Sequence, residues 1–167
     1  MSEDLSQRPE GFQRVARALA ERGHPHAPRW LEVSARTSQE AADALGVQVG
    51  QIAKSVIFRR SADDVAVLVV ASGDRRVDEA KVALQVGPVG RADAAFVKQQ
   101  TGFSIGGVSP VAHVQPPVVL IDRTLFRFDA VWAAAGHPNG VFQASPGALL
   151  ALTGAPAADV VPDEATT

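Results

Sequence analysis

The 167-residue sequence contains no cysteine, which excludes disulfides, thiol nucleophiles, iron–sulfur clusters and cysteine-based zinc sites. Tyrosine is absent as well, so no phenol can act as a general acid. Lysine is scarce, with three lysines among the 16 basic residues. Because the net charge is −2, contact with a nucleic acid would have to come from a local basic patch and not from a broad positive field.

Long apolar segments are missing too. The longest strongly apolar run is the seven residues 65–71, whereas a membrane-spanning helix needs about 20. The first residues, Met1–Asp4, are acidic where a secretory signal would be basic. We therefore expect a cytoplasmic protein that has no membrane partner.

The composition is typical of a globular protein, with 46% hydrophobic and 20% charged residues. A chain of this length buries about 70% of its surface on folding, which is enough for a substantial core. We find no internal repeat and no long linker. The sequence therefore predicts one mixed α/β domain over residues 1–167, with a core at about 10–155 and frayed ends.

Helix and strand signals alternate along the chain. Thr37 and Glu40 form a capping-box pattern, and Asp78 and Asp93 have the position of N-caps. The residues after Gly154 are expected to fray. The predicted helices are 9–22, 38–45, 79–86, 94–100 and 146–152, and the predicted strands are 30–34, 51–59, 65–71, 118–121, 131–135 and 141–144.

Lys54 stands in an apolar strand pattern, 52–58. Side chains alternate between the two faces of a strand, so Lys54 shares a face with Ile52, Val56 and Phe58. An ammonium group in such surroundings is costly unless it meets an anion or opens into a wet pocket. Two interpretations stay open: Lys54 anchors an anionic ligand, or it lies at the strand end and extends into water.

The hairpin that contains Lys54 predicts a cluster of cations. If its turn centres near residues 62–63, Lys54 lies opposite about Ala71. Arg75 and Arg76 then emerge at the same end of the sheet, where the three cations could hold phosphates. In the alternative interpretation, the two arginines pair with neighbouring acidic residues.

Residues 106–110 (GGVSP) form a second candidate site. The amides of Gly106 and Gly107 could bind a carbonyl or a developing oxyanion, because adjacent glycines allow close approach of a ligand. The alternative is an ordinary tight connection. The segment is not a phosphate-binding Walker loop, and Ser109 lacks the second glycine of a nucleophile elbow.

His137 is a third candidate, since it is held on a stiff turn between Gly136 and Pro138. It could touch a polar substrate or merely cap a strand. His24 and His26 have the spacing of metal ligands, but no third ligand lies nearby in the sequence. We expect neither a metal ion nor a cofactor.

Four segments together resemble the YbaK/EbsC family of prolyl-tRNA editing domains: 53–58 (AKSVIF), 72–81 (SGDRRVDEAK), 101–110 (TGFSIGGVSP) and 135–139 (AGHPN). The resemblance extends over about residues 10–155. It implies a mixed α/β fold with a curved, barrel-like sheet and flanking helices. It also implies hydrolysis of the ester that joins a wrong amino acid to the 3′-terminal adenosine of a tRNA, usually tRNA(Pro).

The resemblance further implies roles for individual residues. Lys54 would be the residue most needed for activity and would engage the tRNA end. The loop from Gly106 to Pro110 would position the aminoacyl carbonyl, and His137 would help to choose the substrate. The expected site comprises catalytic Lys54, Gly106 and Gly107, substrate-binding Ser109, Pro110, Gly136, His137 and Pro138, and phosphate-contacting Arg75 and Arg76.

The absence of a strong nucleophile agrees with such a reaction. An aminoacyl ester is already activated, so the attack of water depends mainly on positioning and oxyanion stabilisation. We thus expect a free-standing trans-editing deacylase whose partner is aminoacyl-tRNA, with a prolyl-tRNA synthetase or the translation machinery as a further candidate partner and no role for DNA. Two alternatives stay open: a binding module without turnover, and an enzyme for another small activated ester. Alanine, serine and threonine all remain candidates for the amino acid removed.

Overall fold

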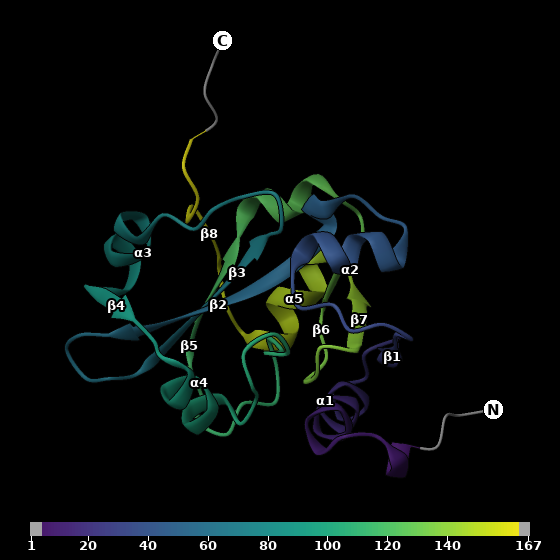
Figure 1. The fold of residues 1–167 in the computed structure, drawn as a ribbon. Coiled ribbons are helices and arrows are strands. Elements are labelled where there is room, and N and C mark those ends of the chain that lie inside the picture. Colours follow the sequence, from purple (N-terminus) through teal and green to yellow (C-terminus); the bar gives the residue numbers. More distant parts are fainter. Residues whose placement is uncertain (1–4, 164–167) are drawn as a thin grey trace.

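The computed structural model describes residues 5–163 of the chain (Figure 1). Its helices are α1 (Glu10–Glu21), α2 (Ser38–Leu45), α3 (Glu79–Val86), α4 (Ala94–Thr101) and α5 (Pro146–Thr153), with short 3-10 helices at Leu5–Gln7, Val49–Gln51 and Arg123–Arg127. Its strands are β1 (Arg29–Trp30), β2 (Ile52–Arg60), β3 (Ala66–Ser72), β4 (Val89–Arg91), β5 (Val118–Asp122), β6 (Val131–Ala134), β7 (Gly140–Ala144) and β8 (Ala157–Ala158).

Local signals in the sequence fix the helix ends. The Thr37 hydroxyl accepts a hydrogen bond from the Glu40 N–H at 3.1 Å, and the Glu40 carboxylate accepts one from the Thr37 N–H at 3.2 Å. This capping box satisfies two amides that the first turn of α2 would leave free. Gly46 ends the helix in the left-handed region at φ 70°. Asp78 and Asp93 cap α3 and α4 as predicted.

The eight strands form one mixed sheet in the order β1-β7-β6-β2-β3-β5-β8, and β4 pairs with β2 beside this path. The hairpin β2–β3 is antiparallel, whereas β2–β6, β3–β5 and β5–β8 are parallel. Lys54 lies opposite Ala71, as the hairpin argument predicts. The predicted mixed α/β fold with flanking helices is therefore confirmed.

Apolar clusters lie on both faces of the sheet. The largest contains Phe12 and Leu19 of α1, Val97 of α4 and Leu149 of α5, packed against β3 and β5. A second cluster joins Val82 of α3 to β3 and the C-terminal segment. Every residue of β3 is buried, as expected for a central strand that is covered on both sides. In Figure 1, β2 runs across the centre of the molecule, with α3 and β4 at its left and α1 and β1 at the lower right.

One edge of β2 is paired only at its two ends. Opposite β3, strand β6 pairs with Ile52 and Ala53, and β4 pairs with residues 58–60. Within the described part of the chain, no strand pairs with residues 54–57 on this side. The sheet therefore has a gap next to the middle of β2, and the candidate site lies at this gap.

Three predictions about secondary structure are wrong. The strand predicted at 30–34 is limited to Arg29–Trp30, because residues 31–35 bond instead to the turn before β7. Residues 89–91, which are absent from the predicted strands, form strand β4. The segment after Gly154 is predicted to fray, but its described part, up to residue 163, is packed on the domain. Strand β8 pairs with β5, and Val160 and Val161 are buried against α3. Residues 164–167 of that prediction lie outside the described residues.

Candidate functional site

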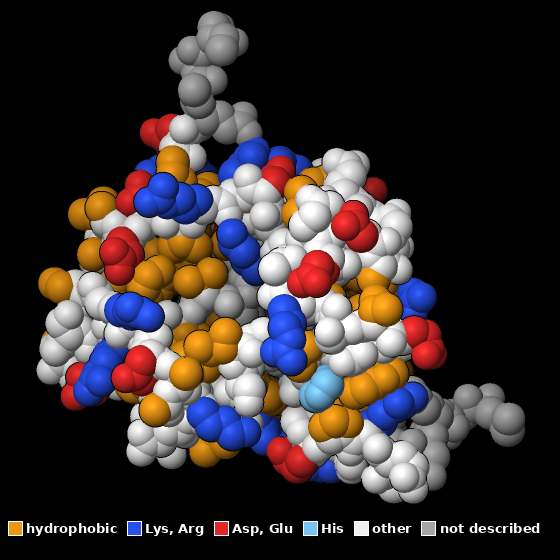
Figure 2. Space-filling view, viewed as in Figure 1, with side chains coloured by type: hydrophobic (Ala, Val, Ile, Leu, Met, Phe, Trp, Pro, Cys, Tyr) orange, Lys and Arg blue, Asp and Glu red, His pale blue; other side chains and the backbone are white. Residues whose placement is uncertain are grey.

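A cavity of about 430 Å³ opens beside the middle of β2. Most of its wall comes from four segments that are far apart in the sequence: 35–38, 52–57, part of 105–108 and part of 132–141. Ala41, Ala92 and Val97 complete the lining. Lys54, Gly106 and His137 all line this cavity. Figure 2 shows a hollow on this face, with Lys and Arg side chains around it and hydrophobic side chains beside it. The structure thus brings one residue of each predicted candidate group to one place.

The Lys54 ammonium is held at the end of the β2–β3 hairpin. Its Nζ donates a hydrogen bond to the Arg75 carbonyl at 2.5 Å. Partial burial lowers the pKa of Lys54 below its usual value, and the negative charges of Asp122 and Asp74 oppose this effect. Within the described part of the chain, the Arg75 carbonyl is the one hydrogen-bond partner of the ammonium, so two of its N–H groups can bind an anionic ligand.

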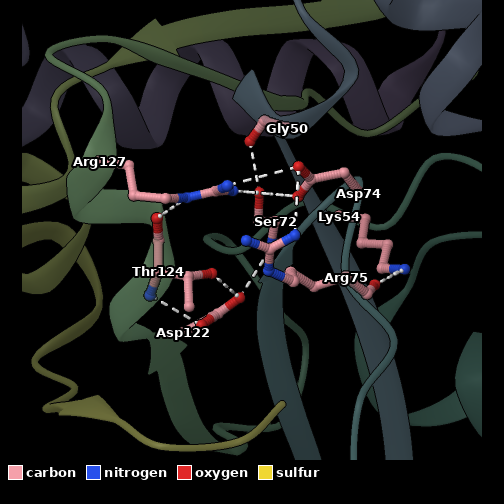
Figure 3. A network of polar contacts seen from close by, with 8 residues as sticks. All are labelled: Gly50, Lys54, Ser72, Asp74, Arg75, Asp122, Thr124 and Arg127. Carbon is pink, nitrogen blue, oxygen red and sulfur yellow. Dashed lines mark hydrogen bonds and ion pairs between the residues drawn. The ribbon is translucent and has the colours of Figure 1, made fainter. Parts of the chain in front are cut away.

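A polar network centred on buried Asp122 and Ser72 fixes the segment that holds Lys54 (Figure 3). The Asp122 carboxylate is fully buried and accepts hydrogen bonds from the N–H of Ser72 and from both the N–H and the hydroxyl of Thr124, at 2.7–3.0 Å. The Ser72 hydroxyl donates to the Gly50 carbonyl at 2.6 Å. Arg127 binds both the Ser72 hydroxyl and the Asp74 carboxylate. These contacts hold residues 72–75 in place, and with them the Arg75 carbonyl.

Replacement of Asp122 by asparagine should therefore destabilise the protein. The asparagine amide has one acceptor oxygen where aspartate has two, and its NH2 group would face the N–H and O–H donors of Ser72 and Thr124. Each buried donor left without a partner costs about 1–3 kcal/mol. We expect the free energy of unfolding in urea to fall by about 2–4 kcal/mol. The matched control is Asp43→Asn on the exposed side of α2, where we expect a change below about 0.5 kcal/mol. Equal effects of the two substitutions would contradict this role for Asp122.

The two predicted phosphate-binding arginines differ. Arg75 lies near Asp74, with Nη1 to Oδ2 at 3.5 Å, so the alternative interpretation describes its side chain. Arg76 is exposed, and no ion pair to it is found among residues 5–163. Neither residue lines the cavity. Of the two, Arg76 has the side chain that is open to a ligand at this end of the sheet.

The glycine loop contributes to the cavity through Gly106, which has φ 98°. The Gly107 N–H is bonded to the Ser104 carbonyl at 3.1 Å, whereas no main-chain bond from the Gly106 N–H is found among residues 5–163. A Cβ on Gly107 would lie 2.7–2.9 Å from the backbone of His137, so this loop packs directly on the next one. Ser109 and Pro110 are buried behind the cavity wall and do not line it.

The turn that carries His137 is bound to the segment before α2. The Leu31 and Ala35 amides donate to the carbonyls of Asn139 and Pro138, at 2.6 and 2.7 Å. The Asn139 N–H donates to His137 Nδ1 at 3.0 Å, so the neutral ring carries its proton on Nε2. Gly136 and Pro138 shape this turn but lie outside the cavity lining.

Burial and the nearby Arg36 guanidinium lower the pKa of His137 below 6.5. We expect an NMR titration of the imidazole to give a pKa below 6.5, and Arg36→Ala to raise it. Since the folded protein binds this proton less readily than the unfolded chain, the contribution of His137 to stability is present above pH 6.5 and is lost as the pH falls through the folded pKa. A wild-type pKa at or above 6.5 would contradict the arrangement.

Sequence reasoning gave no role in the site to four polar residues that line the cavity: Arg36, Thr37, Ser38 and Ser55. Arg36 is exposed at its mouth and packs over Gly106: a Cβ built on Gly106 would lie 3.7 Å from Arg36 Cγ. Its one sequence signal is its position beside the Thr37 cap, which places it at the start of α2. Ser55 also lines the cavity, although the strand pattern alone gives it no role.

Among residues 5–163, no group of three or more His, Asp or Glu side chains is placed to hold a metal ion. Within the same range, no helix is long and apolar enough to cross a membrane.

Comparison with known proteins finds a matching family model and several similar proteins. The family model of the aminoacyl-tRNA editing domain matches residues 32–152. The uncharacterized protein YwhH of Bacillus subtilis is 38% identical over 117 residues, which cover 70% of this chain and 74% of that protein. The proline--tRNA ligase of Lactobacillus helveticus is 33% identical over 109 residues, which are 64% of this chain and 19% of the ligase. The match thus spans about a fifth of that enzyme.

Two solved structures share the fold over almost their whole length. A candidate trans-editing enzyme for prolyl-tRNA synthetase has a TM-score of 0.86 and 41% identity, covering 93% of this chain and 99% of its own. The hypothetical protein APE2540 has a TM-score of 0.82 and 33% identity, covering 89% and 99%. The chain belongs to the aminoacyl-tRNA editing domain family.

Proposed function

We propose that the protein is a trans-acting deacylase that hydrolyses the ester bond of a mischarged tRNA, tRNA(Pro) carrying a small non-cognate amino acid. The observation that carries this proposal is that Lys54 and Gly106, which are far apart in the sequence, line the same cavity. Family membership and the likeness to a candidate trans-editing enzyme for prolyl-tRNA synthetase support it. We place the reaction in the cytoplasm, with aminoacyl-tRNA as the partner.

In the proposed reaction, Lys54 binds the terminal ribose-phosphate of the tRNA through the N–H groups that the Arg75 carbonyl does not use. A water molecule adds to the ester carbonyl carbon, and the Gly106 N–H donates to the oxygen as its negative charge develops. The bond from the carbonyl carbon to the ribose oxygen then breaks. The ribose oxygen takes up the proton that the water loses and becomes a hydroxyl, and a free amino acid leaves.

The cavity suits a small amino acid joined to a ribose. A volume of about 430 Å³ is in the range of small-molecule sites. Its apolar lining includes short side chains, namely Ala53, Ala92, Val97, Val108 and Ala133. A larger amino acid would compete with the ribose for this space. We therefore propose alanine, serine or threonine as the residue removed.

Arg36 and His137 border the mouth of the cavity. Arg36 is an exposed cation on the same rim as Lys54 and can bind a second phosphate of the acceptor end. His137 lines the same cavity, and its neutral ring carries the proton on Nε2. In the proposed complex this N–H donates to the ester end of the substrate. Arg76 is a further candidate for phosphate contact outside the cavity, and a prolyl-tRNA synthetase is a candidate partner that would supply the tRNA.

The test is incubation of the purified protein with tRNA(Pro) charged with alanine, serine, threonine or proline. We expect release of free amino acid from at least one of the first three and not from the proline ester. Protection of all four esters would identify a binding module without turnover. Equal hydrolysis of a short aminoacyl-adenosine would instead indicate an enzyme for small activated esters.

A further inference from the structure

The unpaired middle of β2 presents main-chain groups to the cavity. Ile52 bonds through its carbonyl to the Gly73 N–H at 2.7 Å, and Arg60 bonds through its N–H to the Val65 carbonyl at 2.9 Å, both on the β3 side. In an antiparallel pair, every second residue of a strand bonds to the neighbouring strand through both its N–H and its C=O, and the N–H and C=O of the residues between them point away from that strand. The residues with even numbers therefore bond to β3, and the N–H and C=O of Ser55 point to the opposite side.

No strand meets Ser55 on that opposite side, because the described pairing with β6 ends at Ala53 and the pairing with β4 begins at Phe58. The six consecutive residues 52–57 all line the cavity. If only one face of the strand were turned to the cavity, only every second residue of the strand would line it. The edge of the strand therefore faces the cavity, with Ser55 in the middle of the open stretch.

The side chain of Ser55 does not close this edge. Its Oγ is buried and has no hydrogen-bond partner among the described residues. The residue as a whole is only partly buried, so its accessible atoms belong to the main chain and Cβ. One donor and one acceptor are thus held on a rigid strand and left open to whatever enters the cavity.

We propose that the aminoacyl group of the substrate binds Ser55 as a residue of a neighbouring antiparallel strand would. The ester carbonyl accepts from the Ser55 N–H, and the α-ammonium group donates to the Ser55 C=O. An amino acid ester carries this donor and acceptor with the spacing of one strand residue, and such main-chain pairing is the basis of strand addition in peptide recognition. The inference rests on the proposed function and names the group that the site recognises.

This pairing also directs the substrate side chain. Residues opposite one another in an antiparallel pair put their side chains on the same face of the sheet. The substrate side chain would thus lie on the face of Ser55, which it shares with Ala53 and Ile57. Val97 and Val108 belong to the apolar cluster on that face and also line the cavity. Together with Gly106, the Ser55 N–H would supply the two donors typical of an oxyanion hole.

The first arm of the test compares two substitutions of one residue. Ser55→Ala keeps both main-chain groups, whereas Ser55→Pro removes the N–H that points into the gap. Proline is tolerated in strands where the N–H does not serve the ladder, so we expect both variants to fold with similar melting temperatures. We expect Ser55→Pro to have a kcat about 10²-fold or more below that of Ser55→Ala, which keeps the N–H. A folded Ser55→Pro variant as active as Ser55→Ala would overturn the inference.

The second arm changes the substrate and does not depend on folding of a variant. Propionyl-tRNA(Pro) differs from alanyl-tRNA(Pro) by a hydrogen in place of the ammonium group. With each rate divided by spontaneous hydrolysis of the same ester, we expect the wild-type enhancement to be at least about tenfold smaller for the propionyl ester. Equal enhancements would overturn the inference alone. No release from the alanyl, seryl or threonyl ester would overturn the proposed function, and the inference with it.

Discussion

Replacement of Lys54 by alanine should reduce deacylation of mischarged tRNA(Pro) by about 10²–10³-fold, because the ribose-phosphate next to the ester loses its anchor and the ester is no longer held in position. The ammonium is aimed into the site by one short bond to the Arg75 carbonyl, so alanine removes the anchor without breaking the fold. Removal of a partly buried charge should leave the free energy of unfolding unchanged or higher. The measurement is single-turnover hydrolysis with the protein in excess.

Lys98→Ala is the matched control for this change. Lys98 is exposed on α4 and donates one bond to a backbone carbonyl, that of Gly102 at 3.1 Å, so both substitutions remove one ammonium and one such bond. We expect the control to keep the wild-type rate. A folded Lys54→Ala protein with near-wild-type hydrolysis would refute the anchoring role of Lys54.

Replacement of Gly107 by alanine should have the second largest effect. The added Cβ would lie 2.7–2.9 Å from N, Cα and C of His137, and no rotamer change can relieve a clash with backbone. The His137 turn is held by bonds to Leu31 and Ala35, so the loop that carries Gly106 has to move. We expect kcat/KM to fall about 10²-fold, since a misplacement of about 1 Å costs that much. Stability should fall by about 1–3 kcal/mol.

Gly90→Ala serves as the control for Gly107→Ala. A Cβ on Gly90 meets no atom within 4 Å, so this variant should resemble the wild type in rate and in melting temperature. Both measurements are needed, because a loss of stability alone would lower the amount of folded protein and not the rate per folded molecule. Wild-type kcat/KM for Gly107→Ala would contradict the close packing of the two loops.

The predictable parts of this fold depend on residues close together in the sequence. Thr37 with Glu40, Asp78 and Asp93 act on amides two or three positions away, so these helix starts follow from the sequence alone. The opposition of Lys54 and Ala71 follows in the same way from a short hairpin. Such features need no knowledge of how distant segments pair.

The parts that escaped prediction depend on distant pairing. Strand β8 forms because it pairs with β5, and Val160 is buried because it packs against α3. The small and acidic residues around them in the sequence predict neither contact. The open edge at Ser55 depends on where β4 and β6 end relative to β2. The place of Arg36 at the cavity likewise depends on bonds from residues 31–35 to the His137 turn.

The most direct test of the central claim is release of labelled amino acid from mischarged tRNA(Pro) with the protein at about one hundredth of the substrate concentration. Catalysis at the cavity beside β2 predicts many equivalents of free amino acid per protein molecule, with proline left on its tRNA. An ester that survives as long as it does in buffer alone, or longer, would contradict the account.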